Sequence, residues 1–243
     1  MRYRFGFIVL FVCLASALGQ TPPPDYRNPT LPLEQRVADL LKRMTLEEKV
    51  GQLTMARRGN FGILDTTGKF NDADARQAFR QMFGVDAKTN PRDAAILRNA
   101  VQRYLREKTQ LGIPALFMGE ALHGFMENGS TSFPQALGLA STWDTDLVRQ
   151  AFTAIADEMA SAGDNQAFSP VINLARDPRW GRTEETYGED PYLSARIGVA
   201  AIEGLQGPNF LIDRHHVLAT PEHFVLRICE WNRPSSELRE QPR

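Results

Sequence analysis

The fold is decided by residues 167–193, AFSPVINLARDPRWGRTEETYGEDPYL, a stretch that changes character twice. It starts with an apolar run at 167–175, typical of a buried strand, and it ends where a helix begins with proline in its first turn. Between the two lies a segment rich in arginines and carboxylates, interrupted by glycines and prolines. A charged helix surface would avoid the glycines and prolines, and a disordered acidic tail would avoid the tryptophan and tyrosine. The stretch therefore predicts an ordered loop, braced by arginine–carboxylate pairs, between a strand and a helix.

The order of strand, loop and helix recurs elsewhere in the chain. Short apolar runs predict two more strands, at 113–119 and 215–220. Amphipathic periodicity and end signals predict helices at 92–110, 144–163 and 191–207. Alternating strands and helices indicate βα units, which assemble into a parallel sheet or a barrel, so the predicted fold class is α/β.

Helix signals also mark the first part of the chain. Residues 33–44 place apolar side chains at a helical period, and Thr45 with Glu48 forms a capping box that opens a second helix. Further along, Asp144 is a candidate cap and Gly163 a candidate stop for the helix between them.

The N-terminus is predicted to be a targeting signal. Residues 1–19 combine the positive start MRYR, the apolar run FGFIVLFVCLASAL and small residues at a cleavage position. The apolar run is shorter than the roughly 20 residues of a membrane-spanning helix, which favours secretion over an anchor. Residues 20–32 are a proline-rich lead-in. We expect an exported protein, periplasmic or extracellular, that is not attached to a membrane after signal cleavage.

Composition excludes several kinds of partner. The chain has 243 residues, a net charge of −1 and 42% hydrophobic residues, which is ordinary for a globular protein and offers no basic excess for nucleic acid. His215, His216 and His223 do not have the spacing of a known metal-ligand set, and no glycine-rich phosphate loop is present. We therefore expect no metal and no cofactor, and we interpret His215 and His216 as core or supporting residues.

Glu120 and His123 are the first candidate site residues. In βα folds, function collects in the loops after the carboxyl ends of the strands, and both residues follow the predicted strand at 113–119. A carboxylate there can accept hydrogen bonds from vicinal hydroxyls, and a histidine can join it. Equally, both could be satisfied by backbone groups within a tight turn flanked by glycines, and the motif alone does not decide between the two.

The charged loop offers four carboxylates, Glu184, Glu185, Glu189 and Asp190, that invite assignment as a catalytic pair. Glycoside hydrolysis with retention needs two carboxyl groups about 5 Å apart, but the adjacent Glu184 and Glu185 would point in opposite directions if extended. We favour a bracing role for most of them, paired with the arginines of the loop. These arginines are Arg176, Arg179 and Arg182. Trp180 is expected to anchor the loop by packing.

Taken together, these segments resemble glycoside hydrolase family 3 in its N-terminal, (β/α)8-like domain. The resemblance covers about residues 33–224 and rests most on one run, RDPRWGRTEE. Five elements occur in the family's order: RVADLLKRMTLEEKVGQL, LGIPALFMGEALHG, TSFPQALGLASTWD, SPVINLARDPRWGRTEETYGEDPYL and HHVLATPEHF.

The resemblance implies a fold, an activity and site residues. Residues 33–224 are expected to form a partial (β/α)8, TIM-barrel-like domain. Family members are retaining exo-β-glycosidases that remove terminal β-linked glucose or xylose, so an oligosaccharide or an aryl glycoside is the expected partner. Glu120 matches the acid that grips sugar hydroxyls, Arg182 matches another sugar contact, and His223 fits a third.

Glu222 departs from the family pattern, which usually has Lys-His-Phe where this chain has Glu-His-Phe. A lysine would donate hydrogen bonds to sugar hydroxyls, whereas an ionised glutamate only accepts them. If Glu222 lies near Glu120, it adds a like charge and raises the pKa of one of the two carboxyls. Glu222 is still expected to contact the substrate.

Residues 225–243 have no family match and are expected to be an aberrant tail. The Ser-Asp-Trp-like segment that carries the family's nucleophilic aspartate has no counterpart here, and neither has its acid/base glutamate, so we assign no catalytic residue in this chain. A complete barrel of this type needs about 250 residues. The domain is therefore expected to be incomplete at its C-terminus, and the polypeptide as written to be inactive.

Two interpretations from different classes remain. In the first, the chain is a fragment of an exported retaining exo-β-glycosidase. In the second, it is a non-catalytic sugar-binding or structural remnant that lacks the nucleophile and the acid/base. The sequence leaves open the choice between glucose and xylose, and the oligomeric state.

Overall fold

The computed structural model describes residues 24–57, 81–83, 90–208 and 212–223. The predicted signal peptide and the tail after residue 224 lie outside the described residues, as does the start of the proline-rich lead-in. The chain divides into two units, Met1–Met44 and Thr45–Arg243.

The first unit contains the short 3-10 helix η1 (Asp25–Arg27) and the helix α1 (Leu33–Arg43), which confirms the helix predicted at 33–44. Asp39 of α1 accepts a hydrogen bond from the backbone N–H of Tyr26 at 3.1 Å, and the Nε of Arg36 donates to the carbonyl of Tyr26 at 3.1 Å. These polar contacts fasten η1 to α1.

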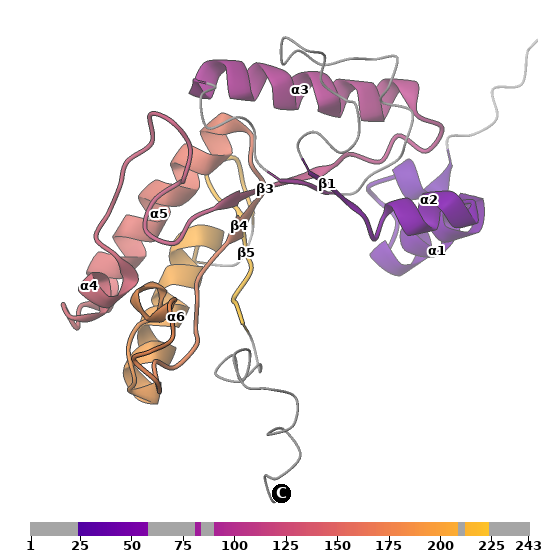
Figure 1. Ribbon diagram of the computed structural model, residues 1–243. Helices are drawn as coiled ribbons and strands as arrows, with labels where there is room; N and C mark the ends of the chain where they lie inside the picture. Colours follow the sequence, from indigo (N-terminus) through magenta and orange to yellow (C-terminus); the bar gives the residue numbers. More distant parts are fainter. Residues whose placement is uncertain (1–23, 58–80, 84–89, 209–211, 224–243) are drawn as a thin grey trace, which may run out of the picture. The chain divides into compact units, whose positions relative to one another are not determined.

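The second unit is built on a parallel sheet whose described strands follow the order of the chain, β1-β2-β3-β4-β5 (Figure 1). In a doubly wound sheet the strand order reverses at a switch point, whereas successive neighbours in chain order are the arrangement of a (β/α)8 barrel. The α/β prediction and the partial TIM-barrel-like fold are confirmed. The strands are β1 (Met55–Arg57), β2 (Gln81–Phe83), β3 (Leu116–Glu120), β4 (Gln166–Phe168) and β5 (Leu218–Ala219).

The strands are shorter than their apolar runs predict. Where a strand at 167–175 is expected, β4 ends at Phe168, and pairing continues beyond it as an isolated parallel bridge between Val171 and Glu222. The cause is Pro170, which has no backbone N–H and cannot donate a ladder hydrogen bond. The polar loop therefore starts earlier than its composition indicates.

The helices begin and end where their caps predict. Asp144 accepts from the backbone N–H of Leu147 at 2.9 Å, Gly163 ends the same helix with φ 95°, and Thr45 and Glu48 form the reciprocal capping box. The helices of this unit are α2 (Leu46–Gly51), α3 (Pro91–Lys108), α4 (Ala136–Ala140), α5 (Thr145–Ala162), α6 (Pro191–Gln206) and the 3-10 helix η2 (Thr183–Glu185).

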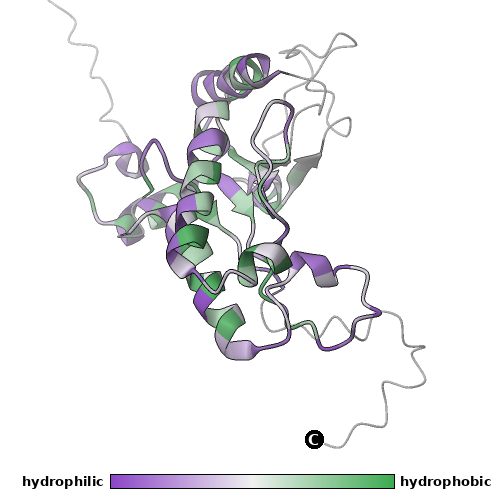
Figure 2. Ribbon diagram, turned by 90° about the vertical axis from the view of Figure 1, so that its left-hand side faces the viewer, coloured by the Kyte–Doolittle hydropathy of each residue, from purple (hydrophilic) through white to green (hydrophobic). Residues whose placement is uncertain are grey.

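The core lies where α5 and α6 pack together against the sheet. Figure 2 shows hydrophobic and hydrophilic residues alternating along these helices, as expected of helices buried on one side. Their approach depends on Gly204, because a Cβ there would lie 2.6 Å from the carbonyl oxygen of Arg149 and 2.7 Å from the Cβ of Phe152. Fully buried members of the core include Val148, Phe152, Ile155, Met159, Ala167, Ile197, Ala201 and Leu205.

A buried ionic cluster joins α3 to the loops around β3 and β4. The guanidinium of Arg98, only 1% exposed, lies 2.5 Å from Glu127 and 2.8 Å from Asp164, and it donates to the carbonyl of Ala162 at 3.0 Å. A Cβ on Gly119 would lie 2.5 Å from Asp164 Oδ2, so β3 makes room for this carboxyl. Burial raises the pKa of Asp164 to about 7 against the opposing effect of Arg98. Nothing in the sequence pattern predicts this cluster.

Substitution of Gly204 by alanine tests the close approach of α5 and α6. The added methyl meets backbone atoms that cannot move away independently, so we expect the free energy of unfolding to fall by about 1–3 kcal/mol. Urea denaturation followed by circular dichroism measures this. Gly181→Ala is the matched control, because nothing lies within 4 Å of its Cβ position. Equal stability of the Gly204→Ala variant and the parent chain would contradict the packing described.

The raised pKa of Asp164 predicts a pH dependence of stability. Between about pH 4 and pH 7 the folded chain keeps a proton on Asp164 that the unfolded chain has released, so this carboxyl's contribution to stability falls as pH rises through that window and is constant above it. Urea titrations give the free energy of unfolding at pH 5 and at pH 8. The difference between these two free energies should be smaller for Asp164→Asn than for the parent chain. Asp146→Asn, on the exposed face of α5, is the control. An undiminished pH dependence in Asp164→Asn would count against the assignment.

Candidate functional site

The candidate site lies at the carboxyl ends of β3, β4 and β5. Glu120 is the last residue of β3, and Glu222 and His223 follow β5. The loop after β4 is held against the segment after β5 by the Val171–Glu222 bridge and by a 2.6 Å hydrogen bond from the N–H of Ile172 to the carbonyl of Glu222. All four predicted substrate contacts, including Arg182 of this loop, are therefore brought to one edge of the sheet.

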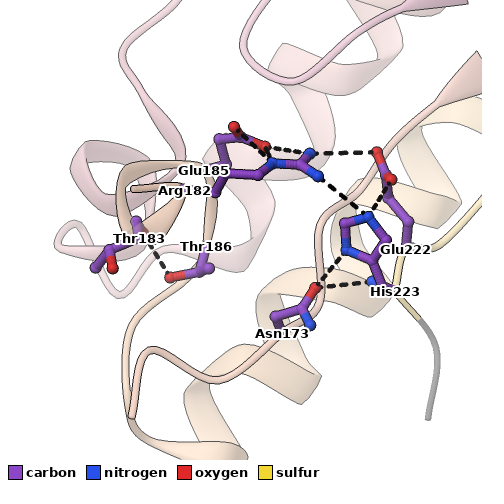
Figure 3. A network of polar contacts seen from close by, with 7 residues as sticks. All are labelled: Asn173, Arg182, Thr183, Glu185, Thr186, Glu222 and His223. Carbon is purple, nitrogen blue, oxygen red and sulfur yellow. Dashed lines mark hydrogen bonds and ion pairs between the residues drawn. The ribbon is translucent and has the colours of Figure 1, made fainter. Parts of the chain in front are cut away.

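Arg182 is the hub of a polar network, shown in Figure 3. Its Nε lies 2.9 Å from both carboxylate oxygens of Glu185, and its Nη2 donates to Glu185 Oε2 at 2.6 Å. Its Nη1 is 3.1 Å from Nε2 of His223, and its Nη2 is 3.9 Å from Glu222 Oε1. The guanidinium thus ties the loop after β4 to the residues after β5.

Asn173 orients His223. Its Oδ1 accepts from the backbone N–H of His223 at 2.8 Å and lies 3.1 Å from the ring Nδ1, so Nδ1 carries a proton. The other ring nitrogen, Nε2, faces both Arg182 and the Oε2 of Glu222, which is 2.9 Å away. A neutral ring accepts from Arg182 at this atom, whereas a protonated ring donates to Glu222. Sequence reasoning missed Asn173, because it lies within the stretch 167–175, which is predicted to be a strand.

Glu120 is the half-buried carboxyl of the site. Its backbone carbonyl accepts from the N–H of Met126 at 3.0 Å, but within the described residues its carboxylate has no hydrogen bond or ion pair. Burial raises its pKa first, and the charges of Glu222 and Glu185 raise it further, against the opposing charge of Arg182. The predicted like-charge effect of Glu222 is confirmed, although burial is the larger cause. Glu120 is therefore placed to accept hydrogen bonds from a ligand.

His123 serves the loop that follows β3. Its Nδ1 is 3.0 Å from the carbonyl oxygen of Phe133, and the N–H of Phe133 donates to the carbonyl of His123 at 2.7 Å. For His123, the interpretation that backbone groups satisfy the side chain is confirmed at Nδ1. The side chain of Glu120 remains available to accept hydrogen bonds from a ligand.

The two neighbouring histidines lie away from the site, and of the two roles predicted for them, core or supporting, the core role is wrong. His215 is exposed and pairs with Asp157 of α5 at 2.6 Å, while His216 is half-buried and pairs with Asp213 at 2.7 Å. Two exposed aspartates keep these rings at the surface. Across the part of the chain that the structure describes, no group of three His, Cys, Asp or Glu side chains is placed to hold a metal ion.

The charged loop contains arginine–carboxylate pairs, but among the described contacts only one of the four predicted carboxylates, Glu185, pairs with an arginine, and the anchor of the loop is different. Arg179 pairs with Asp177 at 2.7 Å, and Arg182 pairs with Glu185. Trp180 is only half-buried, so the prediction that it anchors the loop is wrong. Tyr187, 2% exposed, is the anchor, because it lies just before α6 and packs into the core formed by α5 and α6.

Comparison with known proteins adds a family match over most of the second unit. Residues 45–227 match the family model described as the glycosyl hydrolase family 3 N-terminal domain. The chain is 35% identical over 214 residues to a putative β-xylosidase of Formosa agariphila, covering 84% of this chain and 28% of the relative. It is 33% identical over 192 residues to a periplasmic β-glucosidase of Salmonella typhimurium, covering 78% of this chain and 23% of that one.

A solved structure, a β-glucosidase from Erythrobacter marinus, superposes with a TM-score of 0.73 at 36% sequence identity, covering 83% of this chain and 27% of that chain. The chain thus spans about a quarter of the length of these relatives.

The pKa of Glu120 should respond to the charge of Glu222. Glu222→Gln removes a negative charge that raises this pKa, so we expect it to fall toward its ordinary value, and an NMR titration of carbon-labelled glutamates measures the change. Glu184→Gln is the control, because Glu184 is an exposed carboxylate of the loop after β4. An unchanged pKa of Glu120 in Glu222→Gln would show that the two carboxyls do not interact.

Proposed function

The chain belongs to glycosyl hydrolase family 3, and we propose that it forms the sugar-binding part of an exported, retaining exo-β-glycosidase. The enzyme removes terminal β-linked glucose or xylose from oligosaccharides or aryl glycosides. The names of the relatives, a β-xylosidase and β-glucosidases, support this substrate class. The network around Arg182 is the observation on which the proposal depends, since it gathers the candidate sugar contacts at one edge of the sheet.

The polar groups of the site have the character that a sugar requires. Glu120 offers two acceptor oxygens to vicinal hydroxyls, and no described residue competes for them. Arg182 has five N–H donors, of which Glu185 and His223 engage three by the contacts described, leaving donors on both terminal nitrogens. His223 and Glu222 border the same guanidinium. A ring hydroxyl between Glu120 and Arg182 would therefore both donate and accept.

Retention of configuration needs a nucleophilic carboxylate and a separate acid/base about 5 Å away. Glu185 is engaged by the fork of Arg182, and Glu184 is exposed, so neither is proposed as the nucleophile. We assign both catalytic carboxyls to residues outside these 243. By themselves, the 243 residues are proposed to bind a sugar without hydrolysing its glycosides.

Export is the remaining part of the proposal. It is supported by the charged and apolar character of residues 1–19 and by the relative from Salmonella typhimurium that is described as periplasmic. Among the helices that the structure describes, none has both the length and the apolar character of a membrane span.

Sugar binding by the 243-residue polypeptide tests the proposal. Isothermal titration with glucose and with xylose should detect binding, and Arg182→Ala should weaken it at least tenfold, because charged hydrogen bonds are lost. Arg179→Ala is the matched control: it is an arginine of the same loop that is also paired with a carboxylate, but its side chain is 89% exposed. We expect it to change affinity less than twofold.

A second measurement addresses catalysis. The purified polypeptide should release no p-nitrophenol from aryl β-glucosides or β-xylosides above the uncatalysed rate. Failure of both sugars to bind would refute the proposed sugar site. Robust hydrolysis would instead refute the assignment of the catalytic carboxyls to residues outside the chain.

A further inference from the structure

The site contains more acceptors than free donors. Each carboxylate accepts only, and three of them, Glu120, Glu185 and Glu222, surround a single guanidinium. Glu185 accepts hydrogen bonds from two nitrogens of that guanidinium, so that only one free N–H remains on each terminal nitrogen once His223 is also bound. His223 takes the third nitrogen when its ring is neutral. A ligand at this site therefore meets more acceptor oxygens than free donors.

The formal charge leads to the same expectation. Among the described residues, the three carboxylates and one guanidinium carry two net negative charges when His223 is neutral, and one when it is protonated. Glu120 is the carboxylate most affected by this repulsion, since it is half-buried and is not paired with any described residue. A cationic donor would relieve the repulsion and satisfy the free oxygens together, whereas a neutral hydroxyl would do only the second.

We propose that this site selects a terminal sugar that carries a protonated amino group, whose ammonium is held by the carboxylates of Glu120 and Glu222. An ammonium offers three donors and a positive charge, which match the acceptors and the excess negative charge of the site. Glu222 is the residue that determines this preference, because it adds a second carboxylate near Glu120 and lies 3.9 Å from Arg182, whereas Glu185 lies at 2.6 Å. The inference rests on the proposed function and narrows its substrate class.

Titration of the 243-residue polypeptide with three sugars tests this proposal. The sugars are glucosamine, glucose and N-acetylglucosamine, measured at about pH 6.5, where a primary amino group carries its proton. N-acetylglucosamine has a neutral amide at the same ring position, so it separates charge from size. We expect glucosamine to bind about tenfold more tightly than either neutral sugar, as a charge-assisted contact provides.

Two variants with the same chemical change identify the residue responsible. Glu222→Gln should reduce the ratio of glucosamine affinity to glucose affinity to about one, and Glu222→Asp should restore part of it. Glu184→Gln is the matched control, because it removes an exposed carboxylate of the loop that carries Arg182. The ratio should be the same in Glu184→Gln and in the parent chain. Since the readout is a ratio within one protein, a general loss of stability does not imitate the result.

The outcomes are distinguishable. If glucose binds through Arg182 but glucosamine binds no more tightly, the proposed function stands and the preference for a cationic sugar is wrong. The preference is also wrong if it survives in Glu222→Gln. If none of the three sugars binds, the proposed function fails and this inference fails with it.

Discussion

The site depends on the guanidinium of Arg182. A loop with glycines, prolines and many charges has no regular backbone pairing of its own, so its geometry must come from side chains. Arg182 provides this geometry by gripping Glu185 within the loop and by reaching His223 and Glu222 beyond it. A fork of this kind contributes little net stability but fixes one arrangement. The position of the sugar contacts follows from it.

Packing against the core also holds the loop after β4 in place. Tyr187 fills the core just before α6, and Gly204 lets α6 approach α5 closely enough to form that core. On the opposite side of β3, Arg98 holds Glu127 and Asp164 in a buried cluster. The loop after β3 and the loop after β4 are therefore each fastened by an arginine, one of them buried and one at the site.

Much of this arrangement follows from sequence, because the signals are local. Capping residues such as Asp144 and Gly163 act within one helical turn, and the alternation of strands and helices implies a parallel sheet with its functional loops at one edge. Trp180 was misjudged as the anchor, because size alone does not tell which aromatic side chain faces the core. The roles of Arg98 and Asn173 depend on partners distant in the chain, which no local pattern reveals.

Histidine resonances offer the most direct test of the central claim that the edge around Arg182 binds the sugar. The chain has four histidines, and only His223 contacts Arg182, while His215 and His216 pair with surface aspartates. Long-range proton–nitrogen spectra resolve the two ring nitrogens of each. On addition of glucose, the account predicts that the Nε2 resonance of His223 shifts and that those of His215 and His216 do not. A shift confined to His215 or His216 would contradict it and place binding elsewhere.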